Sequence, residues 1–224
     1  MKEGELSAGA DTLSAVLMDR DGVINRELGR GVRSWEEFEF LPGVLPALQQ
    51  LAALPLRILV LSNQSAIGRG WVAADVVDTI HRHMRRMVRE AGGRIDDVMI
   101  CPHAPDAGCV CRKPRPGLLL QGAQKHGFDL HRAVMVGDSY RDVQAAQAAG
   151  AVPVLVRSGH RVRPEVEARL RREYVRMAPD LAAVAQAIVN GEPFLLAEGE
   201  RKATIGRGTD VAVNGVIPGF PLPR

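Results

Sequence analysis

Short apolar runs alternate with amphipathic segments along most of this chain. The apolar runs predict strands at residues 14–18, 56–61, 97–100, 133–136 and 153–156. Apolar residues at three- and four-residue spacing predict helices after Pro42 and at about residues 73–91, 116–127, 140–149, 164–173 and 179–190. This alternation is typical of βαβ units around a parallel sheet. The chain is therefore predicted to be an α/β protein with a three-layer, Rossmann-like parallel sheet.

Length and composition indicate one domain. The 224 residues suffice for one sizeable core, and 46% hydrophobic with 25% charged residues is ordinary for a soluble globular protein. We expect this domain at residues 14–190, preceded by a tail at 1–13. From residue 191 the composition shifts to glycine, proline and scattered polar residues. Residues 191–224 are therefore expected to be a mobile or loosely packed tail.

The distribution of charge bears on whether nucleic acids or membranes are expected partners. The formal charge is +3 and the pI is near 9.0, with the basic excess in two predicted helical segments, 81–89 and 157–176. We interpret these as solvated helix faces, because few aromatic residues are present to stack nucleic-acid bases. No secretory signal and no apolar run of about 18 residues occurs, and the three cysteines cluster at 101–111. A cytoplasmic protein without nucleic-acid or membrane partners is predicted.

Polar residues stand after the predicted strands, where ligands bind in an open parallel sheet. In chain order they are Asp19 and Asp21, then Ser62, Asn63 and Gln64, then Arg112 and Lys113, then Asp138, and one helical turn later Asp142. Taken singly, each also suits a structural role in a turn, a helix cap or a surface loop. Their joint occurrence at one edge of the sheet predicts a functional site.

The first two acids point to a divalent metal. Asp19 and Asp21 share one face if the strand continues to its end, because strand side chains alternate with a period of two, and Arg20 then points the other way. Two neighbouring carboxylates repel unless a cation, a proton or hydrogen bonds compensate them. Mg²⁺ suits this pair, since it prefers oxygen ligands.

A second metal is predicted in the loop at residues 101–111. Cys101, His103, Cys109 and Cys111 offer three sulfurs and one nitrogen, which is a closed tetrahedral set for structural Zn²⁺. Buried free cysteines beside an unrelated histidine, or a redox pair, are the alternatives. The loop leads directly into Lys113, so a zinc ion there would orient that lysine.

The ordered motifs resemble the haloacid dehalogenase (HAD) superfamily of phosphohydrolases over about residues 14–156. The resemblance implies that Asp19 is the nucleophile and forms an aspartyl phosphate, and that Asp21 acts as acid and then base. It further implies Mg²⁺ bound by Asp19, the main-chain carbonyl of Asp21, and Asp138. Ser62 and Lys113 would hold the phosphoryl oxygens, and Asp142 would hold the lysine or a metal-bound water.

Within the superfamily, three segments are similar to the D-glycero-D-manno-heptose 1,7-bisphosphate phosphatases and to the phosphatase part of the histidinol-phosphate phosphatases. They are the cysteine loop followed by Arg-Lys-Pro, Asp-Arg-Asp-Gly-Val-Ile-Asn at 19–25, and Ser-Asn-Gln-Ser at 62–65. This similarity implies an essentially capless HAD fold and a small phosphorylated sugar that loses its 7-phosphate. The implied substrate contacts are Glu27, Leu28, Gly29, Arg30, Ser62, Asn63, Gln64, Ser65, Arg112 and Lys113.

The sequence departs from this family pattern at a few positions. Ser62 replaces a common threonine, Ala66 replaces a common glycine, and residues 26–31 match the family loop poorly, which leaves the anomer open. Arg30 and Arg33 either supplement Arg112 as phosphate contacts or face solvent. Histidinol-phosphate phosphatase, a nucleic-acid end-processing module and a non-catalytic binding module are the alternative functions. A monomer or weak homo-oligomer is expected.

Overall fold

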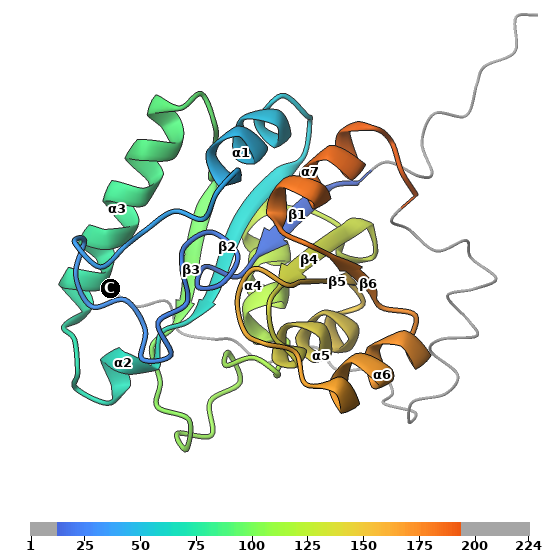
Figure 1. Ribbon diagram of the computed structural model, residues 1–224. Helices are drawn as coiled ribbons and strands as arrows, with labels where there is room; N and C mark the ends of the chain where they lie inside the picture. The colour runs from blue at the N-terminus through green and yellow to red at the C-terminus, as the bar shows by residue number, and fades with distance from the viewer. Residues whose placement is uncertain (1–12, 194–224) are drawn as a thin grey trace, which may run out of the picture.

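A computed structural model describes residues 13–193, and its centre is one six-stranded parallel sheet of order β3-β2-β1-β4-β5-β6 (Figure 1). The strands are β1 (Ala15–Met18), β2 (Arg57–Asn63), β3 (Asp97–Cys101), β4 (Ala133–Gly137), β5 (Val152–Val156) and β6 (Arg176–Ala178). The helices are α1 (Val44–Ala52), α2 (Ser65–Gly68), α3 (Ala74–Glu90), α4 (Gly117–His126), α5 (Tyr140–Ala149), α6 (Pro164–Arg172) and α7 (Leu181–Val189), with one 3-10 turn, η1 (Leu130–Arg132).

The sheet is buried on both faces, which explains why its central strands are apolar throughout. Val16 and Met18 of β1 pack with α1, α3 and α7, whereas Ala15 and Leu17 pack with α4 and α5 on the opposite face. A smaller cluster, which includes Leu170, adds α6 to that second face. The expected three-layer arrangement results (Figure 1).

The strand order reverses between β1 and β4, and this reversal positions the functional residues. Met18 is in register with Val60 of β2 and with Val136 of β4. Asp19 and Asp138 therefore leave the sheet beside each other, at the kind of crevice where open α/β sheets bind ligands. Within residues 13–193, the connections 19–43 and 102–116 contain no helix or strand, so neither forms a cap domain over this crevice.

The predicted strands and longer helices agree with the structure within about two residues at their ends. Three short elements were not predicted: β6, α2 and the 3-10 turn η1. The strand β6 has only three residues, which is too short a segment to show a period-two pattern. The predicted tails lie almost entirely outside the described residues. Among the described residues, no helix has both the length and the apolarity needed to cross a bilayer.

Candidate active site

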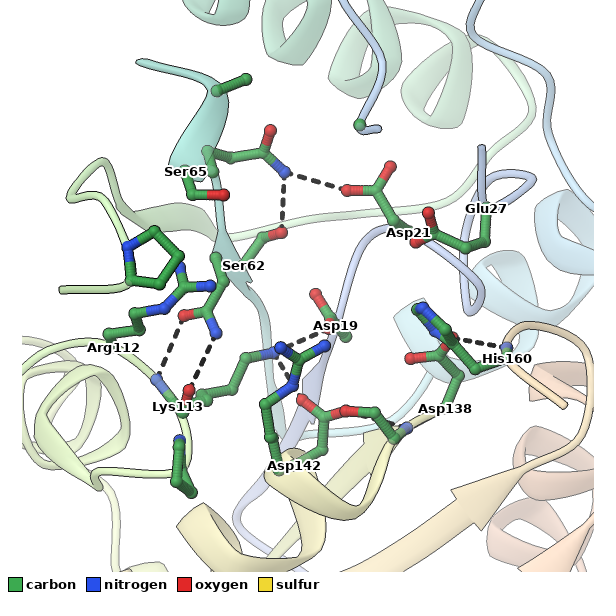
Figure 2. A pocket seen from close by; sticks show the side chains of 18 of the residues that line it. Asp19, Asp21, Glu27, Ser62, Ser65, Arg112, Lys113, Asp138, Asp142 and His160 are labelled. Carbon is green, nitrogen blue, oxygen red and sulfur yellow. Dashed lines mark hydrogen bonds and ion pairs between the residues drawn. The ribbon is translucent and has the colours of Figure 1, made fainter. Parts of the chain in front are cut away.

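The strand-end residues line one cavity of about 600 Å³ at the carboxyl edge of the sheet (Figure 2). The structure brings together in this cavity the predicted residues Asp19, Asp21, Glu27, Gly29, Arg30, Ser62, Asn63, Gln64, Ser65, Arg112, Lys113, Asp138 and Asp142. Leu28 does not line it and instead packs against the hydrophobic core. The reason is that an apolar side chain gains more by leaving water than by facing a polar pocket.

Lys113 is the centre of a buried ionic cluster. Its ammonium lies 2.9 Å from Oδ2 of Asp19 and 2.6 Å from Oδ1 of Asp142, and it donates a 2.7 Å hydrogen bond to the Leu61 carbonyl. Asn63 fixes the lysine backbone through reciprocal hydrogen bonds of 3.0 and 3.1 Å. The lysine is 1% exposed, so its amine keeps one defined position beside Asp19.

The protonation of this cluster follows from burial and charge. Burial raises the pKa of Asp19 to about 7; Asp142 and Asp138 act in the same direction, and Lys113 opposes them. Burial alone would lower the pKa of Lys113, but Asp142 and Asp19 together raise it. The lysine is therefore cationic. Any additional cation beside Asp19 would favour its ionised form.

Asp142 is positioned by the start of α5. Its Oδ2 accepts hydrogen bonds from the Ser139 amide at 3.1 Å and from the Ser139 hydroxyl at 2.5 Å, which forms a capping box at the helix N-terminus. Its other oxygen faces Lys113. Asp142 thus connects the helix cap to the lysine.

Asp21 is held by three different side chains. Nη2 of Arg20 donates to both of its oxygens at 2.9 Å, Asn25 donates to Oδ1 at 2.9 Å, and Gln64 donates to Oδ2 at 2.9 Å. Gln64 also donates to the Ser62 hydroxyl at 2.9 Å. Burial would raise the pKa of Asp21, but Arg20 and the neutral donors lower it.

The position of Arg20 corrects the sequence-based expectation that it points away from the acids. The strand β1 ends at Met18, and the chain turns at Gly22, whose φ is +79°. The alternation of side chains therefore does not continue through Arg20. Its guanidinium folds back to Asp21 in the protein interior.

His160 is a pocket residue that the sequence analysis missed. Its Nδ1 lies 2.6 Å from Oδ2 of Asp138, and its backbone N–H donates to the same oxygen at 2.9 Å (Figure 2). This contact with Asp138 raises the pKa of His160 to about 9. The strand-end pattern gave no signal for it, because His160 lies four residues beyond the end of β5, whereas Asp138 directly follows β4.

The carboxylates beside this histidine are grouped closely enough to hold a cation. Oxygen atoms of Asp19, Asp138 and Asp142 lie within 4.8 Å of one another, and Asp138 forms a second such group with Glu27 and His160. Glu27 is partly withdrawn from water, and burial raises its pKa.

Several arginine side chains line the cavity. Arg112 lines it, and the Nη1 atom of that side chain is buried with no hydrogen-bond partner in the described structure. Arg30 also lines it but pairs with Glu37 at 2.7 Å. Arg33 does not line the cavity, and its guanidinium lies 4.9 Å from the ring centroid of Trp71.

Trp71 and Arg69 are two further lining residues that the sequence did not indicate. The Arg69 guanidinium lies 4.7 Å from the ring centroid of Trp71. This contact depends on how α2 and the following turn pack, so the sequence carried no signal for it.

The cysteine loop forms one wall of the cavity and gathers its four predicted ligands. Cys101 Sγ lies 3.5 Å from His103 Nδ1 and 3.5 Å from Cys109 Sγ, and Cys111 Sγ lies 3.3 Å from the same histidine nitrogen. Tetrahedral zinc ligation places ligand atoms roughly 3.5–3.8 Å apart. All three thiols are free, so these residues fit a zinc ion.

Known proteins are similar to this chain in sequence and fold. A HAD-hydrolase-like family profile matches residues 110–184. The D-glycero-β-D-manno-heptose-1,7-bisphosphate 7-phosphatase of Bordetella bronchiseptica is 38% identical over 177 residues, which cover 79% of this chain and 98% of that protein. The chain belongs to the heptose-bisphosphatase family of HAD-like hydrolases.

A second relative and a solved structure are also similar to this member of the heptose-bisphosphatase family. The D-glycero-α-D-manno-heptose-1,7-bisphosphate 7-phosphatase of Mycobacterium tuberculosis is 42% identical over 142 residues, which cover 61% of this chain and 75% of that protein. A crystal structure of the D,D-heptose 1,7-bisphosphate phosphatase from B. bronchiseptica, complexed with magnesium and phosphate, has a TM-score of 0.73 at 37% identity. It covers 80% of this chain and 99% of that one. The predicted HAD superfamily fold and hydrolase class are confirmed.

Proposed function

We propose that this protein is a magnesium-dependent phosphatase that removes the 7-phosphate of D-glycero-D-manno-heptose 1,7-bisphosphate through an aspartyl-phosphate intermediate. The observation that carries the proposal is the buried Lys113 ammonium, which lies between Asp19 and Asp142 in a cavity that Asp138 also lines. Phosphoryl transfer depends mainly on positioning and on compensation of charge, and this cluster supplies both. The family relatives carry the same activity in their names.

Asp19 is the proposed nucleophile. Its Oδ2 accepts from Lys113, and its Oδ1 accepts from the Arg20 backbone N–H at 2.7 Å, so the carboxylate is fixed at the end of β1. Attack on phosphorus forms the aspartyl phosphate and breaks the bond to the sugar oxygen. The Lys113 ammonium compensates the negative charge of the phosphoryl oxygens, and the Ser62 hydroxyl helps to orient them.

Asp21 is the proposed proton donor and acceptor. It gives a proton to the departing sugar oxygen and then takes one from the water that hydrolyses the aspartyl phosphate. The negative charge of a bound phosphate would raise the pKa of Asp21 against Arg20, Asn25 and Gln64, which lower it. Three side chains hold its carboxylate at the cavity wall, two residues away from the nucleophile. The two acids therefore divide the chemistry between attack and proton transfer.

Mg²⁺ fits the carboxylates of Asp19 and Asp138. Their oxygens lie within 4.8 Å of each other, and both are hard, anionic ligands of the kind this ion prefers. The main-chain carbonyl of Asp21 is the third proposed protein ligand. When bound, the ion would compensate the negative charge of both the nucleophile and the phosphate.

Arg112 is the proposed contact for the second, non-reacting phosphate. Arg112 lines the cavity, and its Nη1 has no hydrogen-bond partner among the described residues. A guanidinium can bind a phosphate with two hydrogen bonds. Heptose bisphosphate offers this phosphate, whereas histidinol phosphate offers a cationic amine that Arg112 would repel.

A side-by-side assay of released phosphate tests this substrate assignment. We expect kcat/KM for heptose 1,7-bisphosphate to exceed that for histidinol phosphate by about 100-fold or more, because a charge-assisted bidentate contact is gained in one case and lost in the other. Arg112→Met should reduce kcat/KM for the bisphosphate about 10–100-fold.

The matched control for Arg112→Met is heptose 7-phosphate, which lacks the 1-phosphate. The variant and the unmodified enzyme should hydrolyse this compound at similar rates. An equal loss on both heptose substrates would contradict the assignment of Arg112, and faster turnover of histidinol phosphate would contradict the proposed substrate.

The four loop residues are proposed to hold structural Zn²⁺, with no position left for a catalytic water. Its role would be to fix the loop that leads to Arg112 and Lys113. Arg115 reinforces the same loop by donating to the carbonyls of Gly108 and Cys109.

Metal analysis of the purified protein should find about one equivalent of zinc that survives removal of magnesium by a mild chelator. Cys109→Ser should lose this zinc and unfold at a lower temperature, because binding energy in such a site is also folding energy. Asp106→Asn, an exposed change in the same loop, is the control and should keep the metal. A well-folded, zinc-free native protein would refute the site.

We also propose that the protein is cytoplasmic and is a monomer or weak homo-oligomer. The three cysteines stand together as candidate zinc ligands and not as a spread-out, even set of the kind that forms disulfides, which supports the compartment.

A further inference from the structure

Arg20 is a charged and fully buried side chain that holds Asp21 together with two neutral side chains. Its exposure is 0%, and its Nη2 donates to both carboxylate oxygens of Asp21. Asp21 lines the cavity but Arg20 does not, so the guanidinium contacts this carboxylate from the protein interior. Burial of a charge costs free energy unless the charge is paired, so the complete burial of Arg20 points to a specific role for its pairing with Asp21.

His81 of α3 supports Arg20 from the other side. Its Nε2 lies 3.0 Å from Nη1 of Arg20, and the ring is 7% exposed. A guanidinium only donates, so Nε2 accepts and the ring proton is on Nδ1. Burial and the Arg20 charge lower the pKa of His81 to about 3, so the ring is neutral.

We propose that Arg20, supported by His81, is a positioning residue that fixes the Asp21 carboxylate for proton transfer to the leaving oxygen. The inference rests on the acid and base role proposed above for Asp21. Asn25 and Gln64 each bind one oxygen of this carboxylate, whereas Arg20 binds both. One nitrogen of Arg20 lies at the same distance from both oxygens, so Arg20 fixes the position of the carboxylate, whereas Asn25 and Gln64 limit its rotation. Proton transfer is sensitive to this position.

Two substrates with different leaving groups separate positioning from a structural role. A sugar alkoxide needs a proton as it leaves, whereas the nitrophenolate of 4-nitrophenyl phosphate does not. The quantity to compare is kcat/KM, because it covers the steps up to departure of the leaving group. A variant that merely weakens the fold loses activity on both substrates alike.

The first experiment compares Arg20→Lys with Asp21→Asn. Asp21→Asn should lower kcat/KM for heptose bisphosphate about 10²–10⁴-fold and Arg20→Lys about 10–100-fold. For 4-nitrophenyl phosphate, both losses should be at least about tenfold smaller. The double variant should be no slower on the sugar than Asp21→Asn alone, because residues that act through one another are not additive.

The second experiment needs no change at Arg20. His81→Leu removes the acceptor for Nη1 and should cause the same selective loss on the sugar, whereas His81→Gln keeps an acceptor and should restore most of it. Equal activities of these two variants would overturn the part assigned to His81.

Two other results would separate failure of the positioning role of Arg20 from failure of the acid role of Asp21. Equal losses of Arg20→Lys on both substrates, or a further loss in the double variant, would overturn the inference while leaving the role of Asp21 intact. If Asp21→Asn itself showed no selectivity for the sugar, the proposed acid role would fail, and the positioning role would fail with it.

Discussion

Replacement of Asp19 by asparagine is expected to lower kcat by about 10⁴-fold or more, because an amide cannot attack phosphorus as a carboxylate does. Asp19 stands where β1 ends, with its two oxygens held by Lys113 and by the Arg20 backbone N–H. The amide would occupy nearly the same space but lacks the anionic oxygen. The loss would be measured as steady-state phosphate release and as covalent labelling of the denatured enzyme by radioactive substrate, which should disappear.

The fold of this variant should remain intact. The introduced amide would lose the charge that pairs with Lys113, but it would also relieve repulsion from Asp138 and Asp142, which contributes to the raised pKa of Asp19. We therefore expect a net change of about 1 kcal/mol or less in the free energy of unfolding, or about 2–4 °C in Tm. Asp78→Asn, an exposed change on α3, is the control for charge removal. Robust turnover by folded Asp19→Asn protein would refute the nucleophile assignment.

The sequence was most informative where a predicted strand ends and a predicted helix or loop begins. A buried strand gives an apolar run, and the polar residue that ends it marks the carboxyl edge of the sheet. That rule alone placed Asp19, Ser62 and Asp138 around one cavity, but it does not reach His160, which lies four residues beyond the end of β5. Lys113 lies in a loop without periodicity, so its place depended on the family resemblance.

The rest of the site depends on packing that no local pattern encodes. Arg20 was expected to alternate away from the acids, but β1 ends two residues earlier and the side chain turns inward. Leu28 was expected to contact substrate but is drawn to the core by its apolar surface. His81 looked like part of a basic helix face, yet α3 turns that position to Arg20.

Replacement of Lys113 by methionine should lower both activity and stability. The variant leaves Asp19 and Asp142 buried without their cation, and breaking a buried ion pair in this way costs about 3–5 kcal/mol of unfolding free energy. It also removes the ammonium proposed to stabilise the phosphoryl oxygens, so kcat should fall about 10²–10³-fold or more. Denaturant unfolding and phosphate release measure the two effects separately.

A double variant separates the two roles of this lysine. Lys113→Met with Asp142→Asn removes a cation and an anion together, so much of the lost stability should return, because fewer buried charges remain unpaired. Activity should not return, since the phosphoryl oxygens still lack an ammonium. Lys125→Met is the matched control: its ammonium lies 2.7 Å from Asp97 but is largely exposed, so its removal should cost about 1 kcal/mol or less. Recovery of turnover in the double variant would show that Lys113 serves only to balance the charge of Asp142, and its proposed role at the phosphate would then be wrong.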